Sequence, residues 1–355
     1  MQKLKVGMIG CGMVSSVYLQ AFSALSQQLE LVGVLASSTD SAHQFICKAQ
    51  SEYPDIWSSA PQPCENADAL MALNPDFVII TTPPNAREAF IDACIAHHVP
   101  VLMEKPVERS SAAATRLVER CEQAGLPLAV MFQHRVRPSA QMLQQHLARA
   151  EAGRLYAVEI SVPWWREQSY YDVQGRGSYA RDGGGVMISQ AIHTLDLVLQ
   201  FTSDIDTVTA VRAQTGFHQL EAEDFVSASI GFSCGAVGHM MASTACYPGR
   251  SEEFWLHFEH CSYKVQSAQI EIFTRASHPD GQGHEICGDI AATGAGADPM
   301  GFTSDWHRLV IENFITHLAD VSPLIATGRS ALHVHHFIDK IEKASQLIPA
   351  PRAHA

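Results

Sequence analysis

The first third of this chain alternates short apolar runs with helical patterns, and this alternation constrains the fold more than any other feature. Alternating strands and helices predict a parallel sheet covered by helices on both faces, as in an α/β domain. The predicted strands are Leu4–Ile9, Leu29–Leu35, Phe77–Thr82, Pro100–Met103 and Pro127–Phe132. The predicted helices are Ser15–Leu25, Ala86–His98 and Ser110–Ala124.

The turn after the first strand has the pattern of a dinucleotide-binding site. It reads Gly10-Cys11-Gly12-Met13-Val14-Ser15 and opens the first helix. Gly10 allows the tight turn, Gly12 lets the backbone approach a pyrophosphate, and Ser15 is small enough for close helix–strand packing. Because the motif follows a strand and begins a helix, we expect this turn, including Cys11, Met13 and Val14, to bind NAD or NADP.

The end of the second strand bears on the choice of coenzyme. Sites specific for NAD usually carry an acidic residue there, which binds the ribose hydroxyls. Here the position is taken by Ser37, followed by Ser38, with no arginine nearby. Without a carboxylate a 2′-phosphate is not repelled, so the sequence favours NADP or the use of both coenzymes. Asp40 is an alternative ribose ligand, although a solvated turn aspartate explains it better.

The third strand ends in a turn at the edge of the sheet where cofactors bind. We expect cofactor contacts from this turn, although a plain proline-rich turn explains its residues equally well. The residues concerned are Thr81, Thr82, Pro83 and Asn85.

The next strand ends in Glu104-Lys105-Pro106. Proline favours an extended conformation at Lys105. A partly buried lysine has a lowered pKa and exchanges a proton near neutrality, so Lys105 is a candidate catalytic group and Glu104 a neighbour of the cofactor. A surface ion pair before a turn is the alternative for these two residues.

After about residue 135 the pattern changes to a run of strands with few helices between them. It predicts an α+β domain with a largely antiparallel sheet, so we expect domains at 1–128 and 129–355. The stretch His278–Pro299 is predicted to be a loop, and the tail Pro349–Ala355 is predicted to fray. The predicted strands are Arg154–Val162, Thr207–Thr215, Asp224–Phe232, Ala236–Ser243, Phe254–Glu259 and Ile270–Phe273, and the predicted closing helices are Asp305–Ala319 and Ser330–Gln346.

Three consecutive glycines, Gly183–Gly185, precede an apolar helical pattern. Glycines at such a place allow the close approach of a backbone or a ligand. Ser189 and His193 follow four residues apart, so a helix would present them on one face. Because histidine titrates near neutral pH, His193 is a candidate for proton transfer.

Together these segments resemble the glucose-fructose oxidoreductase/inositol dehydrogenase family, often called Gfo/Idh/MocA. The resemblance covers essentially the whole chain and rests on the first glycine turn, on Glu104-Lys105-Pro106, and on His193 and Asp196 after the glycine triplet. It implies a Rossmann domain, then an open antiparallel sheet, with the nicotinamide between them. It also implies a cis bond after Lys105, catalytic roles for Lys105 and His193, and a homodimer or homotetramer formed through the sheet.

Three further positions are interpreted through this resemblance. Phe132–Pro138 resembles the family's crossing between domains, with Arg135 at its characteristic arginine. Many members carry an aspartate four residues before the histidine as a proton-relay partner, and here that position is Ser189. Since a hydroxyl cannot hold a negative charge, proton handling falls on His193 and Lys105. Arg87 stands where a histidine is usual, which leaves the ligand contacts of its loop open.

We predict that His193 removes a hydroxyl proton while a hydride passes to the nicotinamide, with Lys105 bonded to the reacting oxygen. Lys105 is the alternative base. The loop before the glycine triplet supplies binding candidates, because aromatic faces stack on sugars and arginines hold hydroxyls, carboxylates or phosphates. The predicted substrate-binding residues are Arg135, Arg166, Tyr171, Arg176, Ser189 and His193.

Composition excludes several classes of partner. With 24 basic and 37 acidic residues, the formal net charge of −13 argues against nucleic acid and anionic membranes. No apolar run spans a bilayer, no signal-peptide pattern opens the chain, and the nine scattered cysteines suit a reducing compartment, so we expect a cytoplasmic protein. His333, His335 and His336 have no acidic or cysteine partner at ligand spacing, so we expect no metal.

The leading hypothesis is a dehydrogenase or reductase that uses NAD or NADP and acts on a sugar, a sugar derivative such as a nucleotide sugar, or a cyclic polyol. A dehydrogenase of aromatic-acid cis-dihydrodiols is an alternative, because Trp164, Trp165 and Arg166 fit an apolar pocket that binds a carboxylate. A cofactor-binding regulator without turnover is a second alternative. Lys105 and His193 argue against it, whereas Ser189 keeps it open.

Overall fold

The computed structural model describes residues 3–54, 59–289 and 303–351, which form two compact units. The first unit comprises the described residues up to Glu108, together with Ala112–Gln133 and Ser304–Leu332. The second comprises Arg109–Ser111, the described part of His134–Thr303 and the described residues from His333 onward. Each unit is therefore built from segments that are distant in sequence, and the contiguous domains 1–128 and 129–355 remain a prediction.

The first unit contains a six-stranded parallel sheet with the order β3-β2-β1-β4-β5-β6. This is the order of the doubly wound dinucleotide-binding fold, so the predicted fold class is confirmed. The order reverses between β1 and β4, and ligands bind in such sheets at the carboxyl ends of the strands beside this reversal. The strands are β1 (Leu4–Ile9), β2 (Leu29–Leu35), β3 (Gln62–Cys64), β4 (Phe77–Ile80), β5 (Val101–Met103) and β6 (Leu128–Val130).

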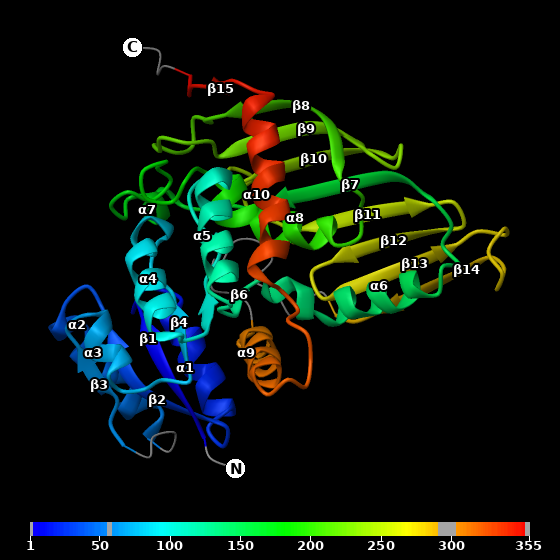
Figure 1. Ribbon diagram of the computed structural model, residues 1–355. Coiled ribbons are helices and arrows are strands. Elements are labelled where there is room, and N and C mark those ends of the chain that lie inside the picture. Colours follow the sequence, from blue (N-terminus) through cyan, green and yellow to red (C-terminus); the bar gives the residue numbers. More distant parts are fainter. Residues whose placement is uncertain (1–2, 55–58, 290–302, 352–355) are drawn as a thin grey trace. The chain divides into compact units, whose positions relative to one another are not determined.

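Helices cover this sheet because its strands are almost entirely apolar. All four side chains of β4 are buried, for example. Figure 1 shows α2 and α3 beside the β2–β3 edge, and α9, from the far end of the sequence, packs against α1. The helices are α1 (Ser15–Ala24), α2 (Thr39–Glu52), α3 (Ala67–Met71), α4 (Glu88–His97), α5 (Ser111–Gln123) and α9 (Asp305–Leu318).

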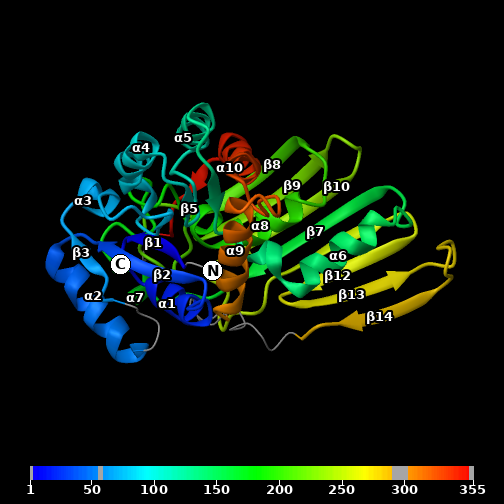
Figure 2. The same ribbon diagram turned by 60° about the horizontal axis from the view of Figure 1, so that its bottom comes forward.

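The second unit contains a nine-stranded sheet with the order β14-β13-β12-β11-β7-β10-β9-β8-β15. Its pairs are antiparallel except β7–β10 and β8–β15, which confirms a largely antiparallel sheet. Figure 2 shows α6 lying across one face of this sheet. Buried and half-buried side chains alternate along a strand such as β12, so one face of the sheet carries the buried side chains. The elements are α6 (Pro138–Ala148), β7 (Leu155–Pro163), α7 (Gln168–Tyr171), α8 (Ile192–Leu199), β8 (Ile205–Ala213), β9 (Phe225–Phe232), β10 (Val237–Ser243), β11 (Glu253–Phe258), β12 (Cys261–Gln266), β13 (Gln269–Thr274), β14 (Gly283–Cys287) and β15 (Leu347–Ile348); α10 (Gly328–Lys343) continues from the first unit into the second.

The structure corrects the sequence prediction at the end of this sheet. Gly283–Cys287, predicted to be part of a loop, forms β14, which pairs with β13. Most of its residues are exposed, so its pattern carries no apolar alternation, and hydrogen bonds to one neighbour define it. The sequence prediction also omitted β12. Residues 278–282 and 288–289 of the predicted loop lie outside any helix or strand. Residues 290–299 of that loop and the last four residues of the predicted frayed tail lie outside the described residues.

All nine cysteines lie in the described residues and are free thiols. No helix of the described residues has both the length and the apolar character that crossing a membrane requires.

Candidate functional site

The turn between β1 and α1 meets the end of β4. Gly10 has a φ of +104°, and the Thr81 hydroxyl donates a hydrogen bond of 2.9 Å to its carbonyl oxygen. A Cβ atom at Gly10 would lie 2.7 Å from Thr81 Oγ1, so glycine is required for both reasons. At Gly12, by contrast, an added Cβ would meet no described protein atom within 4 Å. The backbone at Gly12 is therefore open to a ligand.

The neighbouring groups fit a bound dinucleotide. The first turn of α1 contains no acidic residue and no side-chain cap, so the positive end of the helix is available to a phosphate. Among the described residues, the buried Thr82 hydroxyl at the end of β4 has no hydrogen-bond partner. Ser37 is exposed at the end of β2, whereas the hydroxyl of Ser38 accepts from Ser41 N at 3.1 Å as the cap of α2. The proposed contacts of Pro83 and Asn85 remain predictions.

A buried arginine joins this turn to the turn that carries Lys105. Arg87 is 1% exposed, and its Nε and Nη2 atoms donate to the Thr82 carbonyl at 2.9 and 2.7 Å. Its Nη1 atom donates to the carbonyls of Glu104 and Pro106, on either side of Lys105. Burial lowers the pKa of Arg87 to about 10, which still leaves the guanidinium charged at neutral pH. The resemblance left the ligand contacts of this loop open. In the structure Arg87 holds the two turns together through their backbone carbonyls.

The carboxylate of Glu104 is held from a second direction. Tyr18 donates to its Oε1 atom at 2.8 Å, and His307 Nε2 lies 3.6 Å from the same oxygen. Burial alone would raise the pKa of Glu104, but the hydrogen bond and charge of His307, with the charge of Lys105, lower it below its ordinary value. The peptide bond between Lys105 and Pro106 is cis, as the resemblance implied.

In the second unit, the glycine triplet leads into a helix with an irregular start. Val186 N donates to the Glu223 carbonyl at 2.9 Å, and a Cβ atom at Gly185 would lie 1.8 Å from that oxygen. The predicted regular helix begins instead as a π-helical turn, Met187–Ala191, which continues into α8. Such turns occur frequently at functional sites. Within it, the Ser189 hydroxyl donates to the Gly185 carbonyl at 2.6 Å.

His193 lies in the first turn of α8. Its ring stacks on that of His134, with centroids 4.9 Å apart and an interplanar angle of 29°. Three residues further on, Asp196 accepts two hydrogen bonds from Arg135, of 2.7 Å from Nε and 2.6 Å from Nη2. This buried pair joins the chain segment after β6 to α8, so Arg135 has a structural contact in addition to its predicted role in substrate binding.

A cation–aromatic cluster precedes the glycine triplet. The Arg166 guanidinium lies over the rings of Trp164 and Tyr170, at 5.3 and 5.8 Å from their centroids. Its Nη2 atom donates to Gln190 Oε1 at 3.0 Å, one residue beyond Ser189. The guanidinium of Arg176 lies 4.2 Å from the centre of the Tyr170 ring. The structure thus brings Arg166 and Arg176 to one aromatic side chain beside the helix of His193.

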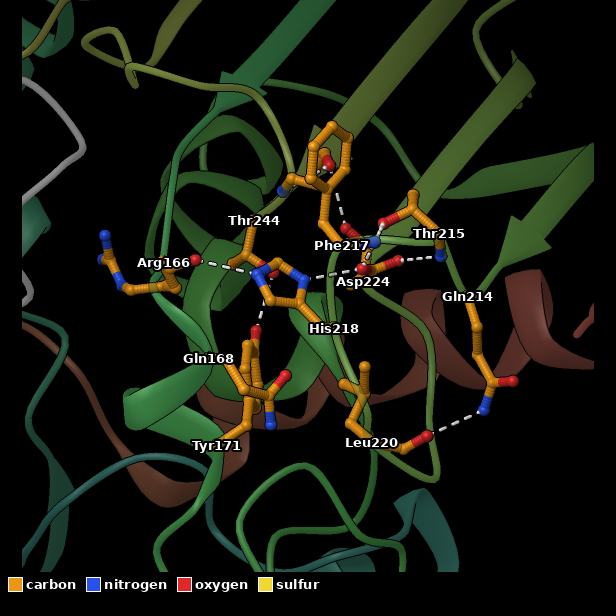
Figure 3. Close-up of polar contacts among 12 residues, drawn as sticks. Arg166, Gln168, Tyr171, Gln214, Thr215, Phe217, His218, Leu220, Asp224 and Thr244 are labelled. Carbon is orange, nitrogen blue, oxygen red and sulfur yellow. Dashed lines mark hydrogen bonds and ion pairs between the residues drawn. The ribbon is translucent and has the colours of Figure 1, made fainter. Parts of the chain in front are cut away.

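The predicted residue Tyr171 lies deeper. Its hydroxyl is 2.6 Å from Thr244 Oγ1, and its ring lies beside His218 (Figure 3). Burial raises its pKa, so the phenol stays protonated. Sequence reasoning missed Gln190, although it follows Ser189 in the predicted helix, and His218, which lies in no recognisable motif. The predicted catalytic residues Lys105 and His193 belong to different units, and their roles remain predictions.

Within the described residues, one group of three side chains could hold a metal ion. Ligand atoms of Glu151, His278 and Asp280 lie within 4.8 Å of one another. The group differs from the three histidines considered from the sequence, and the side chain of Asp280 is 81% exposed. The expectation of no metal is untested.

Two long segments of the chain match models of known families. Residues 4–132 match the model described as "Oxidoreductase family, NAD-binding Rossmann fold", and residues 140–264 match the "GFO/IDH/MocA C-terminal domain". The chain belongs to the Gfo/Idh/MocA family. Membership confirms the resemblance drawn from the sequence and an NAD-binding Rossmann fold.

Relatives within the Gfo/Idh/MocA family are distant. A D-apiose dehydrogenase of Rhizobium rhizogenes (strain K84) is 29% identical over 174 residues, which is 48% of each chain. The chain thus spans about half the length of that curated relative. The WlbA dehydrogenase of Bordetella pertussis, solved with NADH and UDP-GlcNAcA, has a TM-score of 0.78 at 23% identity and covers 97% of this chain and 96% of its own. Levoglucosan dehydrogenase with NADH and levoglucosan has a TM-score of 0.81 at 16% identity, with 97% of both chains covered. At these identities the two structures show the shared fold.

Proposed function

We propose that this protein is a nicotinamide-dependent dehydrogenase or reductase of a secondary alcohol or ketone in a sugar, a sugar derivative or a cyclic polyol. One observation carries the proposal. The open dinucleotide turn at Gly12 and the clamped turn at Lys105 lie at the same edge of one parallel sheet, on β1 and β5, with β4 between them. The turn that would bind the coenzyme and the turn that carries Lys105 thus share one edge of the sheet. Names of relatives, among them apiose, inositol and levoglucosan dehydrogenases, support the substrate class.

The chain's own residues have separate tasks in this proposal. The backbone at Gly12 and the start of α1 bind the pyrophosphate, and the Thr82 hydroxyl bonds the coenzyme. The coenzyme, when bound, exchanges a hydride with the substrate carbon. Lys105 donates a hydrogen bond to the reacting oxygen, and His193 takes the hydroxyl proton during oxidation and returns it during reduction.

The cluster around Arg166 favours a polar substrate over an apolar dihydrodiol. Arg166 bonds the amide of Gln190, and Arg176 lies on the ring of Tyr170, so hydrogen-bond donors and an aromatic face occur together. This combination binds the hydroxyls and the C–H face of a sugar ring. We also propose that both coenzymes are accepted, because Ser37 is exposed where an acidic residue would repel a 2′-phosphate.

A substrate panel tests this function. Purified protein is incubated with NAD⁺ or NADP⁺ and with aldoses, cyclic polyols, nucleotide sugars or aromatic-acid cis-dihydrodiols, and reduced coenzyme is followed by its absorbance. The panel is repeated with the corresponding ketones and reduced coenzyme. Turnover of a sugar or cyclic polyol is expected. Turnover of dihydrodiols alone would replace the substrate class, and coenzyme binding without any turnover would favour a regulator.

A further inference from the structure

His218, in the connection between β8 and β9, is buried between two hydrogen-bond acceptors (Figure 3). Its Nδ1 atom lies 2.7 Å from Asp224 Oδ2, and its Nε2 atom lies 2.7 Å from the carbonyl oxygen of Arg166. The side chains of His218 and Asp224 are both 0% exposed. Water therefore does not compete for either contact.

The surroundings of Asp224 require a carboxylate. Thr215 N donates to its Oδ1 atom at 2.7 Å, and the Thr215 hydroxyl bonds its Oδ2 atom at 2.6 Å. That hydroxyl already accepts a hydrogen bond from Phe217 N, so its own hydrogen is directed to Asp224. Each oxygen of the Asp224 side chain thus faces a hydrogen-bond donor, and a carboxylate accepts at both of its oxygens.

The two partners of His218 then determine its charge. A neutral imidazole donates from one nitrogen only, whereas a carboxylate and a carbonyl oxygen both accept. Both contacts are satisfied together only when both ring nitrogens carry hydrogen. Burial alone would lower the pKa of His218, but the hydrogen bonds to Asp224 and the Arg166 carbonyl, with the charges of Asp224 and Glu167, raise it above its ordinary value. Tyr171 also packs against the ring, and its phenol is neutral because burial raises its pKa.

His218 holds the residue whose side chain reaches the helix of His193. Arg166 N donates to the Thr244 carbonyl at 2.9 Å, so the Arg166 backbone is held through its N–H and through its carbonyl oxygen. The Arg166 guanidinium then bonds Gln190, three residues before His193. Loss of the His218 side chain would leave the buried carbonyl oxygen of Arg166 without its charged donor, and the backbone of Arg166 would become less firmly held.

We propose that His218 is a buried imidazolium that stays charged at neutral pH and positions Arg166 for substrate binding. His218 is a positioning residue, since it acts through the Arg166 backbone. The role in substrate binding rests on the proposed function, whereas the charge of His218 and its hold on Arg166 do not.

The first experiment needs no substrate. Protein labelled with ¹⁵N-histidine is compared with His218→Gln by long-range ¹H–¹⁵N spectra at pH 8. We expect a histidine signal with both ring nitrogens protonated in the wild type and the loss of that signal in the variant. A spectrum of the wild type in which every histidine is neutral at pH 8 would overturn the charged state. Asp224→Asn provides a second route, because it removes the ionic partner and should make His218 neutral while keeping the shape of the site.

The second experiment tests positioning. Amide hydrogen exchange of residues 164–172 should increase in His218→Gln and stay unchanged in His43→Gln, an exposed histidine of the other unit. On a substrate found in the panel, KM should rise about tenfold, the effect of one lost charge-assisted hydrogen bond, with coenzyme affinity unchanged. Unchanged exchange in a folded variant would disprove positioning. Increased exchange with an unchanged KM would show that His218 holds the Arg166 backbone but has no part in substrate binding. A wild type without turnover on any substrate would contradict the proposed function and leave the charge of His218 unaffected.

Discussion

Arg87 donates a buried hydrogen bond to the backbone carbonyl of Glu104, and so a guanidinium on the loop after β4 holds the turn after β5. The same side chain bonds the carbonyl of Thr82, beside the proposed coenzyme site. One residue therefore connects the two turns whose side chains the proposed reaction needs. Lysine at this position would keep a positive charge but lacks the planar fork that reaches several carbonyl oxygens at once.

Arg87→Lys is accordingly expected to lower kcat about tenfold or more, because Lys105 loses its fixed position. It should also lower the free energy of unfolding by about 2 kcal/mol, since buried carbonyls lose their donors. Steady-state kinetics and urea unfolding measure the two effects. Arg116→Lys, on the exposed face of α5, is the matched control and should change neither. Wild-type kinetics in Arg87→Lys would show that the clamp has no part in catalysis.

Lys105→Met and His193→Ala test the proposed proton transfer. Each should reduce kcat by about 10²–10⁴-fold, the usual contribution of a positioned acid or base, and leave coenzyme affinity within a few-fold of the wild type. Turnover and coenzyme fluorescence titrations give the two quantities. Lys48→Met, an exposed lysine of α2, controls for loss of a charge. Near-normal turnover in both variants would remove these residues from the mechanism.

Ser37→Asp tests the basis of coenzyme choice. A carboxylate at the end of β2 would repel a 2′-phosphate and bond ribose hydroxyls, so the Kd for NADP should rise about tenfold relative to that for NAD. The wild type should bind both with similar affinity. Ser51→Asp adds the same charge to an exposed position of α2 and should leave the ratio unchanged. A strong preference of the wild type for NAD would contradict the interpretation of Ser37.

Gly185→Ala tests the close packing of the backbone before the His193 helix against the carbonyl of Glu223. The added Cβ atom would stand 1.8 Å from the Glu223 carbonyl oxygen, a backbone atom, so the chain must shift. Unfolding free energy should fall by about 2 kcal/mol or more. Gly216→Ala is the control in the same unit, because its Cβ would meet no described atom within 4 Å. Equal stability of the two variants in urea would contradict this packing.

Glu223 predicts a pH dependence of stability. Its carboxyl is 1% exposed, and burial, helped by the charge of Glu342, raises its pKa from 4.5 to about 7 against two backbone hydrogen bonds and the charge of Arg212. A group whose pKa is raised on folding contributes stability below its unfolded pKa and loses it as the pH rises through the folded value. The contribution should therefore decline between about pH 5 and pH 8, by an amount on the order of 3 kcal/mol.

Glu223→Gln removes this titration and should flatten the decline, while its side-chain oxygen still accepts from Met187 N, as Glu223 Oε1 does at 3.3 Å. Urea midpoints at pH 5, pH 6.5 and pH 8 provide the measurement. The exposed Glu221, two residues earlier, supplies the control variant Glu221→Gln. An identical pH profile in wild type and Glu223→Gln would show that Glu223 does not titrate in this range.

The predicted position of the glycine turn between a strand and a helix is confirmed, because the turn's geometry depends on adjacent residues and on the elements that flank it. Its binding of a coenzyme stays a prediction. The alternation of strands and helices likewise determined a parallel sheet. The strand β14 was missed because it is an exposed edge strand, defined by hydrogen bonds to β13 rather than by side chains.

The sequence by itself determined the family and the glycine turn between β1 and α1, and it supplied the candidates Lys105 and His193, since each lies in a local motif. Only the tertiary structure showed what supports them. Arg87 reaches the Lys105 turn from the preceding loop and His307 reaches it from a helix about 200 residues later, while His218 reaches Arg166 from the β8–β9 connection. Such contacts depend on strand order and on which side chains are buried together. Burial then decides their charge states, because an ionised group without water needs a partner that only the fold supplies.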